Sequence, residues 1–174
     1  MTFAVLKPLI QSIASAHGYD AALLAAQASA ESGFNPEAVS GAGAKGLMQF
    51  MDATWAEWGQ GSPFDPSASL DAGVRYMKSL LARYANAAEP VSLALAAYNA
   101  GMGTVDKAIS RTGRTDWAGV ESALPAETRA YVPRILDRAA LYKAAFVAGA
   151  VGLGTTGVAL LAFLGFVLLR RIMA

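Results

Sequence analysis

Apolar side chains recur at helical spacing along most of the chain. Leu6, Ile10 and Ile13 lie three or four positions apart, which predicts an opening amphipathic helix that ends near Gly18. Similar spacing predicts further helices over residues 21–31, 47–58, 69–84, 90–98, 104–110 and 116–124, and one that starts at residue 125. Asp52 and Thr54 are possible later starts of the helix over residues 47–58. Sustained alternation of apolar and polar residues, the mark of a half-buried strand, is missing from the sequence. The pattern therefore predicts an all-α domain.

Local signals set several helix ends. Asp20 precedes the alanine-rich run 21–31 and is a suitable N-cap, while Gly33 and Pro36 follow that run and stop it. Pro133 falls within the last pattern and predicts a kink or a restart of the helix there.

Residues 144–169 contain no charged side chain, and Arg170 and Arg171 close this apolar segment. A helix of this length is about 39 Å long, enough to cross a hydrocarbon core of about 30 Å with some tilt. We therefore expect two parts, a domain over residues 1–143 and one C-terminal transmembrane helix over residues 144–171.

Two further expectations attach to this segment. The terminal arginines favour a cytoplasmic C-terminus, although basic residues also precede the segment and weaken the orientation signal. Small residues at helical spacing offer a face for self-association, namely Ala145, Gly149, Gly152 and Thr156.

At the other end of the chain, Lys7 and Pro8 interrupt the first apolar residues, so we expect no secretory signal peptide.

The amino-acid composition excludes several classes of protein and of functional site. Hydrophobic residues make up 55% and charged residues 16% of the 174 positions, which excludes a disordered chain. Of the charged residues, all 13 acidic and 12 of the 14 basic ones precede residue 144, so the first part is close to neutral and shows no basic footprint for nucleic acid. With no cysteine and a single histidine, the sequence excludes cysteine metal sites and a multi-histidine metal site, and we expect chemistry carried by carboxylates, hydroxyls and amides.

Glu31 is the candidate acid. It stands at the end of an otherwise apolar helix, where its neighbours exclude water and the helix dipole presents its negative end. Both effects disfavour the carboxylate, so the sequence predicts a raised pKa and a group that can donate a proton near neutral pH.

Several short motifs surround this acid in the sequence. They are Glu-Ser-Gly-Phe-Asn-Pro at 31–36, Ala-Val-Ser at 38–40, Gly-Ala-Lys-Gly-Leu-Met-Gln at 43–49, Ala-Tyr-Asn-Ala-Gly at 97–101 and Glu-Thr-Arg-Ala-Tyr-Val at 127–132. In their order and spacing, over residues 20–135, they resemble the catalytic domain of the soluble lytic transglycosylases, relatives of goose-type lysozyme. The resemblance implies a small lysozyme-like helical fold.

It also implies cleavage of the β-1,4 bond between N-acetylmuramic acid and N-acetylglucosamine in peptidoglycan, without metal or cofactor. In this family one glutamate, here Glu31, protonates the glycosidic oxygen and then takes the proton of the C6 hydroxyl, which attacks C1 and leaves a 1,6-anhydro end. Ordinary glycosidases need two carboxylates. Asp52 and Glu57 lie outside the matching motifs and are interpreted as a helix cap and an exposed helix face.

The resemblance extends to the substrate-binding residues. Ser32 is expected to hold substrate or orient the acid, with a local helix-end hydrogen bond as the alternative. Gly46 would let the backbone approach the sugar, and Met48 and Gln49 would line the cleft, although Met48 also suits a core position.

The remaining expected contacts face the glutamate. Tyr98 would position the acid, Asn99 would bind an N-acetyl group, and Tyr131 would close the same wall, although both tyrosines also suit a helical core. Glu127 is interpreted as a structural contact at a helix start.

The leading hypothesis is a membrane-anchored lytic transglycosylase whose partners are glycan strands and, through residues 144–169, a lipid bilayer. Three alternatives stay open: a muramidase-type hydrolase, a non-catalytic structural or glycan-binding virion membrane protein, and a holin-like membrane protein. The catalytic domain is expected to face the cell wall. Because no signal peptide is expected, a bacteriophage particle that opens the wall is favoured over a secretion machine.

Overall fold

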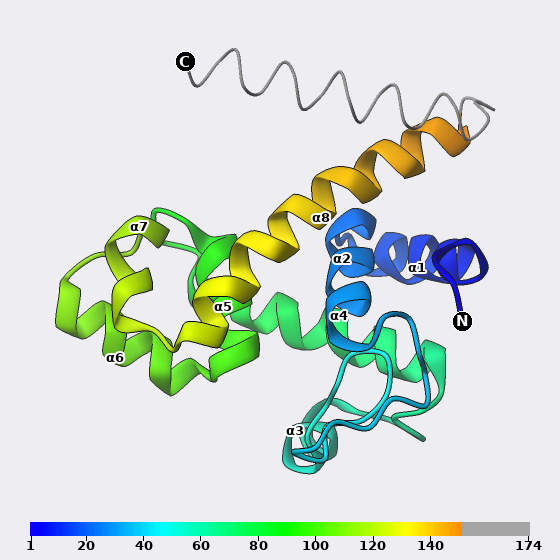
Figure 1. The fold of residues 1–174 in the computed structure, drawn as a ribbon, viewed down its shortest axis with the longest axis horizontal. Helices are drawn as coiled ribbons and strands as arrows, with labels where there is room; N and C mark the ends of the chain where they lie inside the picture. Colours follow the sequence, from blue (N-terminus) through cyan, green and yellow to red (C-terminus); the bar gives the residue numbers. More distant parts are fainter. Residues whose placement is uncertain (151–174) are drawn as a thin grey trace.

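The computed structural model describes residues 1–150, which fold as a set of packed helices (Figure 1). The elements in chain order are α1 (Phe3–His17), α2 (Ala21–Ser32), α3 (Asp52–Trp58), α4 (Pro66–Arg83), α5 (Pro90–Ala100), α6 (Met102–Thr112), α7 (Trp117–Val120), a 3₁₀ turn η1 (Glu121–Ala123) and α8 (Ala126–Ala150). Within this range β pairing is limited to isolated bridges in the loop between α2 and α3. The predicted all-α class is confirmed for the described residues.

The predicted ends of α2 are confirmed. The Asp20 side chain accepts hydrogen bonds from the backbone N–H groups of Ala22 and Leu23, and so caps the first turn. Gly33 ends the helix in the left-handed conformation, which glycine adopts without strain. Glu31 is thereby fixed in the last turn of a capped helix.

Helix α3 begins at Asp52, one of the two possible starts named for the helix predicted over residues 47–58, so residues 47–51 are not helical. Lys45 and Phe50 exchange backbone hydrogen bonds of 2.9 and 3.0 Å, and Gln49 between them has a positive φ of 50°. These residues therefore form a tight loop, a conformation that helical periodicity does not reveal.

The core has two clusters on either side of α2 and α4. One joins α1, α2 and the following loop to α4, with Leu6, Ile10, Leu24, Leu47 and Leu70 at its centre. The other joins α4, α5, α6 and α8, with Met77, Leu93, Leu95, Val105 and Ile135. In Figure 1, α1 and the α6–α7 region lie at opposite ends, and α8 crosses between them along α2 and α5. This crossing brings the start of α8 to the end of α2.

Helix α8 runs continuously through Pro133 to Ala150 and does not restart at the proline. The expected domain boundary after residue 143 therefore falls inside a helix. None of the helices in residues 1–150 combines the length and the hydropathy needed to cross a membrane. Residues 151–171 of the predicted transmembrane helix, with Gly152 and Thr156 of its small-residue face, lie outside the described residues.

Candidate active site

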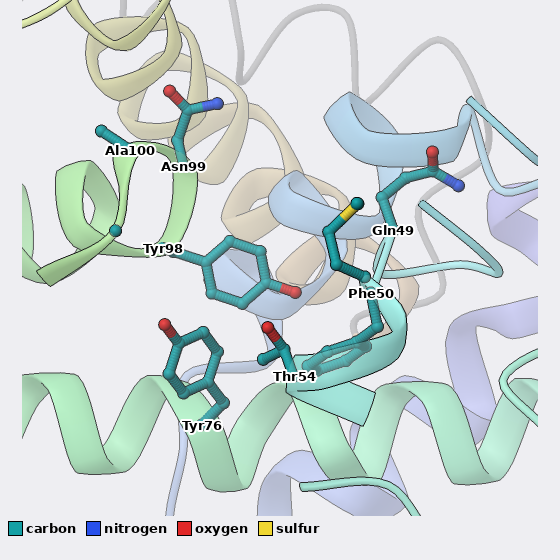
Figure 2. A pocket seen from close by; sticks show the side chains of 9 residues that line it. Gln49, Phe50, Thr54, Tyr76, Tyr98, Asn99 and Ala100 are labelled. Atoms are coloured by element: carbon teal, nitrogen blue, oxygen red, sulfur yellow. The ribbon is translucent and has the colours of Figure 1, made fainter. Parts of the chain in front are cut away.

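A cleft opens where the ends of α2 and α5, the start of α8 and the loop before α3 meet. Its larger part, of about 410 Å³, is lined by Ala30, Glu31, Ser40, Ala42, Ala44, Gln49, Met51, Tyr98, Asn99, Glu127, Tyr131 and Arg134. A smaller part, of about 300 Å³, shares four of these residues and adds Phe50, Thr54, Tyr76, Ala100 and Gly101 (Figure 2). The predicted acid thus lies in a hollow that is large enough for part of a sugar chain.

Glu31 lies half-buried in the wall of the larger part. Burial raises its pKa to about 7, a hydrogen bond from Tyr131 and the nearby charge of Arg134 oppose this rise, and the charge of Glu127 adds to it. The predicted raised pKa is confirmed, with loss of hydration as its main cause. At neutral pH such a carboxyl group exchanges readily between its acid and base forms.

Tyr131 is the residue that holds the acid. It is 2% exposed, and its hydroxyl donates a hydrogen bond of 2.6 Å to Oε1 of Glu31. The two residues are 100 positions apart and meet only because α8 crosses the end of α2. Tyr131, expected only as part of the wall, is therefore a direct partner of the acid.

Tyr98 does not position the acid through a hydrogen bond, and that prediction is corrected. Its hydroxyl donates to the backbone carbonyl of Met48 at 2.7 Å, which ties α5 to the loop before α3. Figure 2 shows Tyr98 reaching across the pocket above Tyr76 of α4, and the two ring centroids are 5.4 Å apart. Tyr98 still lines both parts of the cleft, as an aromatic wall.

Asn99 also lines both parts, but its amide is already engaged. Its Nδ2 donates to Glu127 at 3.2 Å, and its Oδ1 accepts from the hydroxyl of Thr128 at 2.7 Å. The predicted structural contact of Glu127 at the helix start is confirmed by this bond. Because both ends of the Asn99 amide face the first turn of α8, this residue chiefly joins α5 to α8.

The loop residues divide between the cleft and the core. Gln49 lines both parts of the cleft, as predicted, and its Nε2 donates to the carbonyls of Ala38 and Gly46. Met48 is fully buried, and its side chain packs against Gly73 of α4, so its expected place in the cleft wall is wrong. The backbone carbonyl of Met48 accepts the hydrogen bond from Tyr98, and this is its contact with a residue of the cleft.

Gly46 and Ser32 both make contacts within the protein itself. A Cβ at Gly46 would lie 1.9 Å from the carbonyl oxygen of Pro63, so this glycine is needed for packing within the protein, and its expected role in the approach of a sugar stays a prediction. Ser32 donates to the carbonyl of Ala28 at 3.1 Å, the local bond named as its alternative. It is not among the residues that line the cleft.

The other acids that the sequence weighed lie away from Glu31. Asp52 is the first residue of α3, caps nothing, and pairs with Lys45 at 2.6 Å. Glu57 is exposed. Among the described residues, Glu127 is the second carboxylate of the cleft, and no group of three potential metal ligands is present in that part of the chain.

Sequence reasoning missed two residues around the acid. Arg134 lines the cleft, and its guanidinium lies 5.7 Å from the ring centroid of Tyr131, one turn earlier on α8. Gln27, one turn before Glu31 on α2, is completely buried. Its signal in the sequence is a lone amide in an apolar helix, on the same face as the acid.

Three solved structures with a similar fold are described as lytic transglycosylases. An inactive mutant of the lytic transglycosylase Slt from Pseudomonas aeruginosa matches 82% of this chain with a TM-score of 0.70 and 26% identity, and the match covers 24% of that chain. The 70 kDa soluble lytic transglycosylase of Escherichia coli matches 81% of this chain with a TM-score of 0.68 and 28% identity, over 24% of its own chain. A complex of the 70 kDa enzyme with bulgecin A gives a TM-score of 0.69 at 29% identity, over 79% of this chain and 24% of that one.

Proteins that are similar in sequence are also named as lytic transglycosylases. The protein named membrane-bound lytic murein transglycosylase F from Desulfosudis oleivorans is 37% identical over 127 residues, which are 68% of this chain. The protein of the same name from Alteromonas mediterranea is 38% identical over 132 residues, or 71% of this chain. This chain spans 28% of the length of each of them. The model of the transglycosylase SLT domain matches residues 8–118, and the chain belongs to that family.

Proposed function

We propose that this chain is a peptidoglycan lytic transglycosylase that cleaves the β-1,4 bond between N-acetylmuramic acid and N-acetylglucosamine. The observation that carries the proposal is Glu31, a carboxyl group in a cleft with a pKa of about 7 and a hydrogen bond from Tyr131. Family membership and the names of the relatives support the same activity.

The reaction uses Glu31 twice. Its neutral form gives a proton to the glycosidic oxygen as the bond to C1 breaks, and the resulting carboxylate then takes the proton of the C6 hydroxyl. The C6 oxygen bonds to C1, which forms the 1,6-anhydro end and returns Glu31 to its neutral form. Because acid and base steps alternate on one group, a pKa near the working pH serves both.

Tyr131 and Arg134 favour the base form of this group. Both lower the pKa of Glu31 against the effect of burial, so the carboxylate that forms when the bond breaks is stabilised at once. Gln49, Tyr98 and Asn99 line the remaining walls and are the proposed substrate contacts.

A muramidase-type hydrolase is the second candidate, and one observation favours it. Glu127 lines the same cleft as Glu31, and a hydrolase would need such a second carboxylate to activate water or to act as nucleophile. The hydrogen bond from Asn99 engages Glu127 at the start of α8, which supports the structural role instead.

Mass spectrometry of the muropeptides that the complete chain releases from purified sacculi separates the two reactions. The transglycosylase proposal predicts anhydro-muramyl ends with the wild-type chain and with Glu127→Gln, and a loss of release with Glu31→Gln. Reducing ends, one water heavier and lost with Glu127→Gln, would identify a hydrolase. Folded chains that release nothing would favour a structural or glycan-binding protein.

The apolar residues 144–169 and the membrane-bound relatives support a membrane anchor, with the catalytic domain facing the cell wall. Fractionation of cells that express the complete chain or residues 1–150, each with the same fluorescent fusion, tests the anchor. The complete chain is expected in the membrane pellet after an alkaline carbonate wash. Equal release of both proteins into the wash would overturn it. The phage context remains a prediction.

A further inference from the structure

Gln27 is a buried polar residue that the proposed reaction has not yet used. It lies on α2, its side chain is fully enclosed, and its Oε1 accepts a hydrogen bond of 3.1 Å from the hydroxyl of Tyr19. Its Nε2 is also buried, and it has no hydrogen-bond partner among the residues that the structure describes. An amide N–H that has lost its water without gaining a partner is costly, so its position needs a reason.

The surroundings of Gln27 supply that reason. Gln27 precedes Glu31 by one helical turn, so both side chains lie on the face of α2 that α8 covers. Tyr131 of α8 is buried and binds Glu31 through its hydroxyl. The Gln27 side chain lowers the pKa of Tyr131, as an amide N–H near this hydroxyl does, against the larger rise that burial and the neighbouring Glu31 cause.

We propose that Gln27 is a positioning residue, whose amide is held at Oε1 by Tyr19, presents an N–H to the Tyr131 oxygen and thereby fixes Tyr131 as the hydrogen-bond donor to Glu31. This inference rests on the proposed function of Glu31. A hydroxyl that faces an N–H does not point its own hydrogen toward it. The hydrogen of Tyr131 is therefore directed to Oε1 of Glu31, the bond seen at 2.6 Å.

The consequence is a choice between the two oxygens of the acid. Oε1 is occupied as an acceptor, so the exchangeable proton of Glu31 is carried by Oε2. A Tyr131 that was free to turn would instead accept the proton of the neutral acid and hold it away from the glycosidic oxygen. Gln27 thus keeps the acid proton available for transfer to substrate.

The test is the variant Gln27→Met, which keeps the volume of the side chain and removes both amide groups. Without the N–H, Tyr131 can accept a proton from the neutral acid, so the titration midpoint of Glu31 moves to higher pH. The other charged groups that face Glu31, Arg134 and Glu127 on α8, are unchanged in this variant. We expect kcat to fall about three- to tenfold, the equivalent of one hydrogen bond, with KM unchanged.

A cycle with Tyr131→Phe shows whether Gln27 acts through Tyr131. Adding Gln27→Met to Tyr131→Phe is expected to change neither kcat nor the midpoint further, because the hydroxyl that Gln27 orients is already gone. Ser92→Ala is the matched control, since Ser92 is a buried polar residue of α5 that bonds Glu89 away from the cleft. It is expected to leave the kinetics and the midpoint of Glu31 unchanged.

The midpoint is read from the side-chain carboxyl ¹³C signal of Glu31 in the complete chain, so this arm decides the role of Gln27 even if no muropeptide is released. If Gln27→Met does not fold, Tyr19→Phe replaces it in the test. Loss of the Tyr19 hydroxyl leaves Oε1 of Gln27 without its hydrogen bond and lets the Gln27 amide turn. An upward shift in the variant that folds, absent in the Tyr131→Phe background, supports the proposal. An unchanged midpoint, or a shift that persists without the Tyr131 hydroxyl, overturns it.

Discussion

The helical wall of the cleft, formed by α2, α5 and α8, differs in construction from the loop wall, residues 38–51. The helical wall presents titratable side chains, with Glu31, Glu127, Tyr131 and Arg134 within reach of one another. The loop wall presents small residues and Gln49, and backbone hydrogen bonds such as that from Gly46 to the carbonyl of Ala38 hold it in shape. Acid strength is therefore a property of the helical wall, whereas the shape of the cleft depends on the loop wall.

Tyr98 joins the two walls, because it starts on α5 and its hydroxyl binds the carbonyl of Met48 in the loop. Tyr131 stays within the helical wall and binds Glu31. These two tyrosines allow the difference between the walls to be tested. The hydrogen bond of Tyr131 affects the acid strength of Glu31, and the hydrogen bond of Tyr98 affects the shape of the loop wall.

The largest expected effect comes from breaking the loop wall at Gly46. Gly46→Ala places a side chain at a φ of 76° and 1.9 Å from the carbonyl oxygen of Pro63. Strain and overlap together are expected to lower the free energy of unfolding by about 3 kcal/mol or more, measured by urea denaturation. Gly41→Ala is the control, because a Cβ at Gly41 meets nothing within 4 Å. Equal stability of the two variants would contradict the packing role of Gly46.

The next effect concerns the helical wall and depends on pH. The pKa of Glu31 is about 7 in the folded chain against an ordinary value of 4.5, so the folded state binds the proton more tightly. Stability is therefore lost as the pH rises from about 4.5 to about 7, and the loss is complete above the folded pKa. Glu31→Gln removes this loss and is expected to raise the free energy of unfolding at pH 8 by about 2 kcal/mol, and to change it little at pH 4.

Denaturation at both pH values, with the exposed Glu37→Gln as control, measures this effect. A Glu31→Gln chain that is less stable than the wild type at pH 8 would contradict the burial of the acid.

Exchanging the two tyrosines for phenylalanine sharpens the comparison. Tyr131→Phe removes a bond that lowers the pKa of Glu31, so the titration midpoint of the acid should rise. Tyr98→Phe leaves the Met48 carbonyl without its partner and should lower the free energy of unfolding by about 1–2 kcal/mol.

Hydrogen exchange of the loop amides is expected to quicken only in Tyr98→Phe, and the midpoint of Glu31 to move mainly in Tyr131→Phe. Comparable shifts of the midpoint in both variants would show that the walls do not act separately.

The smallest effect is expected at Ser32, whose hydroxyl bonds within its own helix. Ser32→Ala should change the free energy of unfolding by no more than about 0.5 kcal/mol and leave the rate of muropeptide release within about twofold of the wild type. A tenfold slower release would restore Ser32 as a substrate contact.

Local features of the chain could be predicted well from the sequence. The Asp20 cap and the end of α2 at Gly33 depend on neighbours within a turn or two, which the sequence shows directly. The direction of the pKa shift of Glu31 was also predicted, although the residues that modify it, Tyr131, Arg134 and Glu127, are distant in the sequence. The motif that contains Gly46 and Met48 marked the loop wall correctly. The directions of its side chains depend on a tight loop whose backbone geometry periodicity does not encode.

Partners distant in sequence were harder to predict. The sequence analysis assigned Tyr98 to the acid and Tyr131 to the wall, and only the crossing of α8 over α2 shows that Tyr131 binds the acid. Arg134 was missed for the same reason, although it follows Tyr131 by one turn. Gln27 carried a usable signal, since a single amide in an apolar helix, one turn from the candidate acid, needs a buried partner.

The most direct test of this account is the titration of Glu31 in the complete wild-type chain, followed by its side-chain carboxyl ¹³C signal between pH 3 and pH 9. The account predicts a midpoint near 7, because burial raises the pKa of this carboxyl group more than Tyr131 and Arg134 lower it. A midpoint near the ordinary value of 4.5 would leave the cleft without a proton donor at neutral pH and would contradict the proposed role of Glu31.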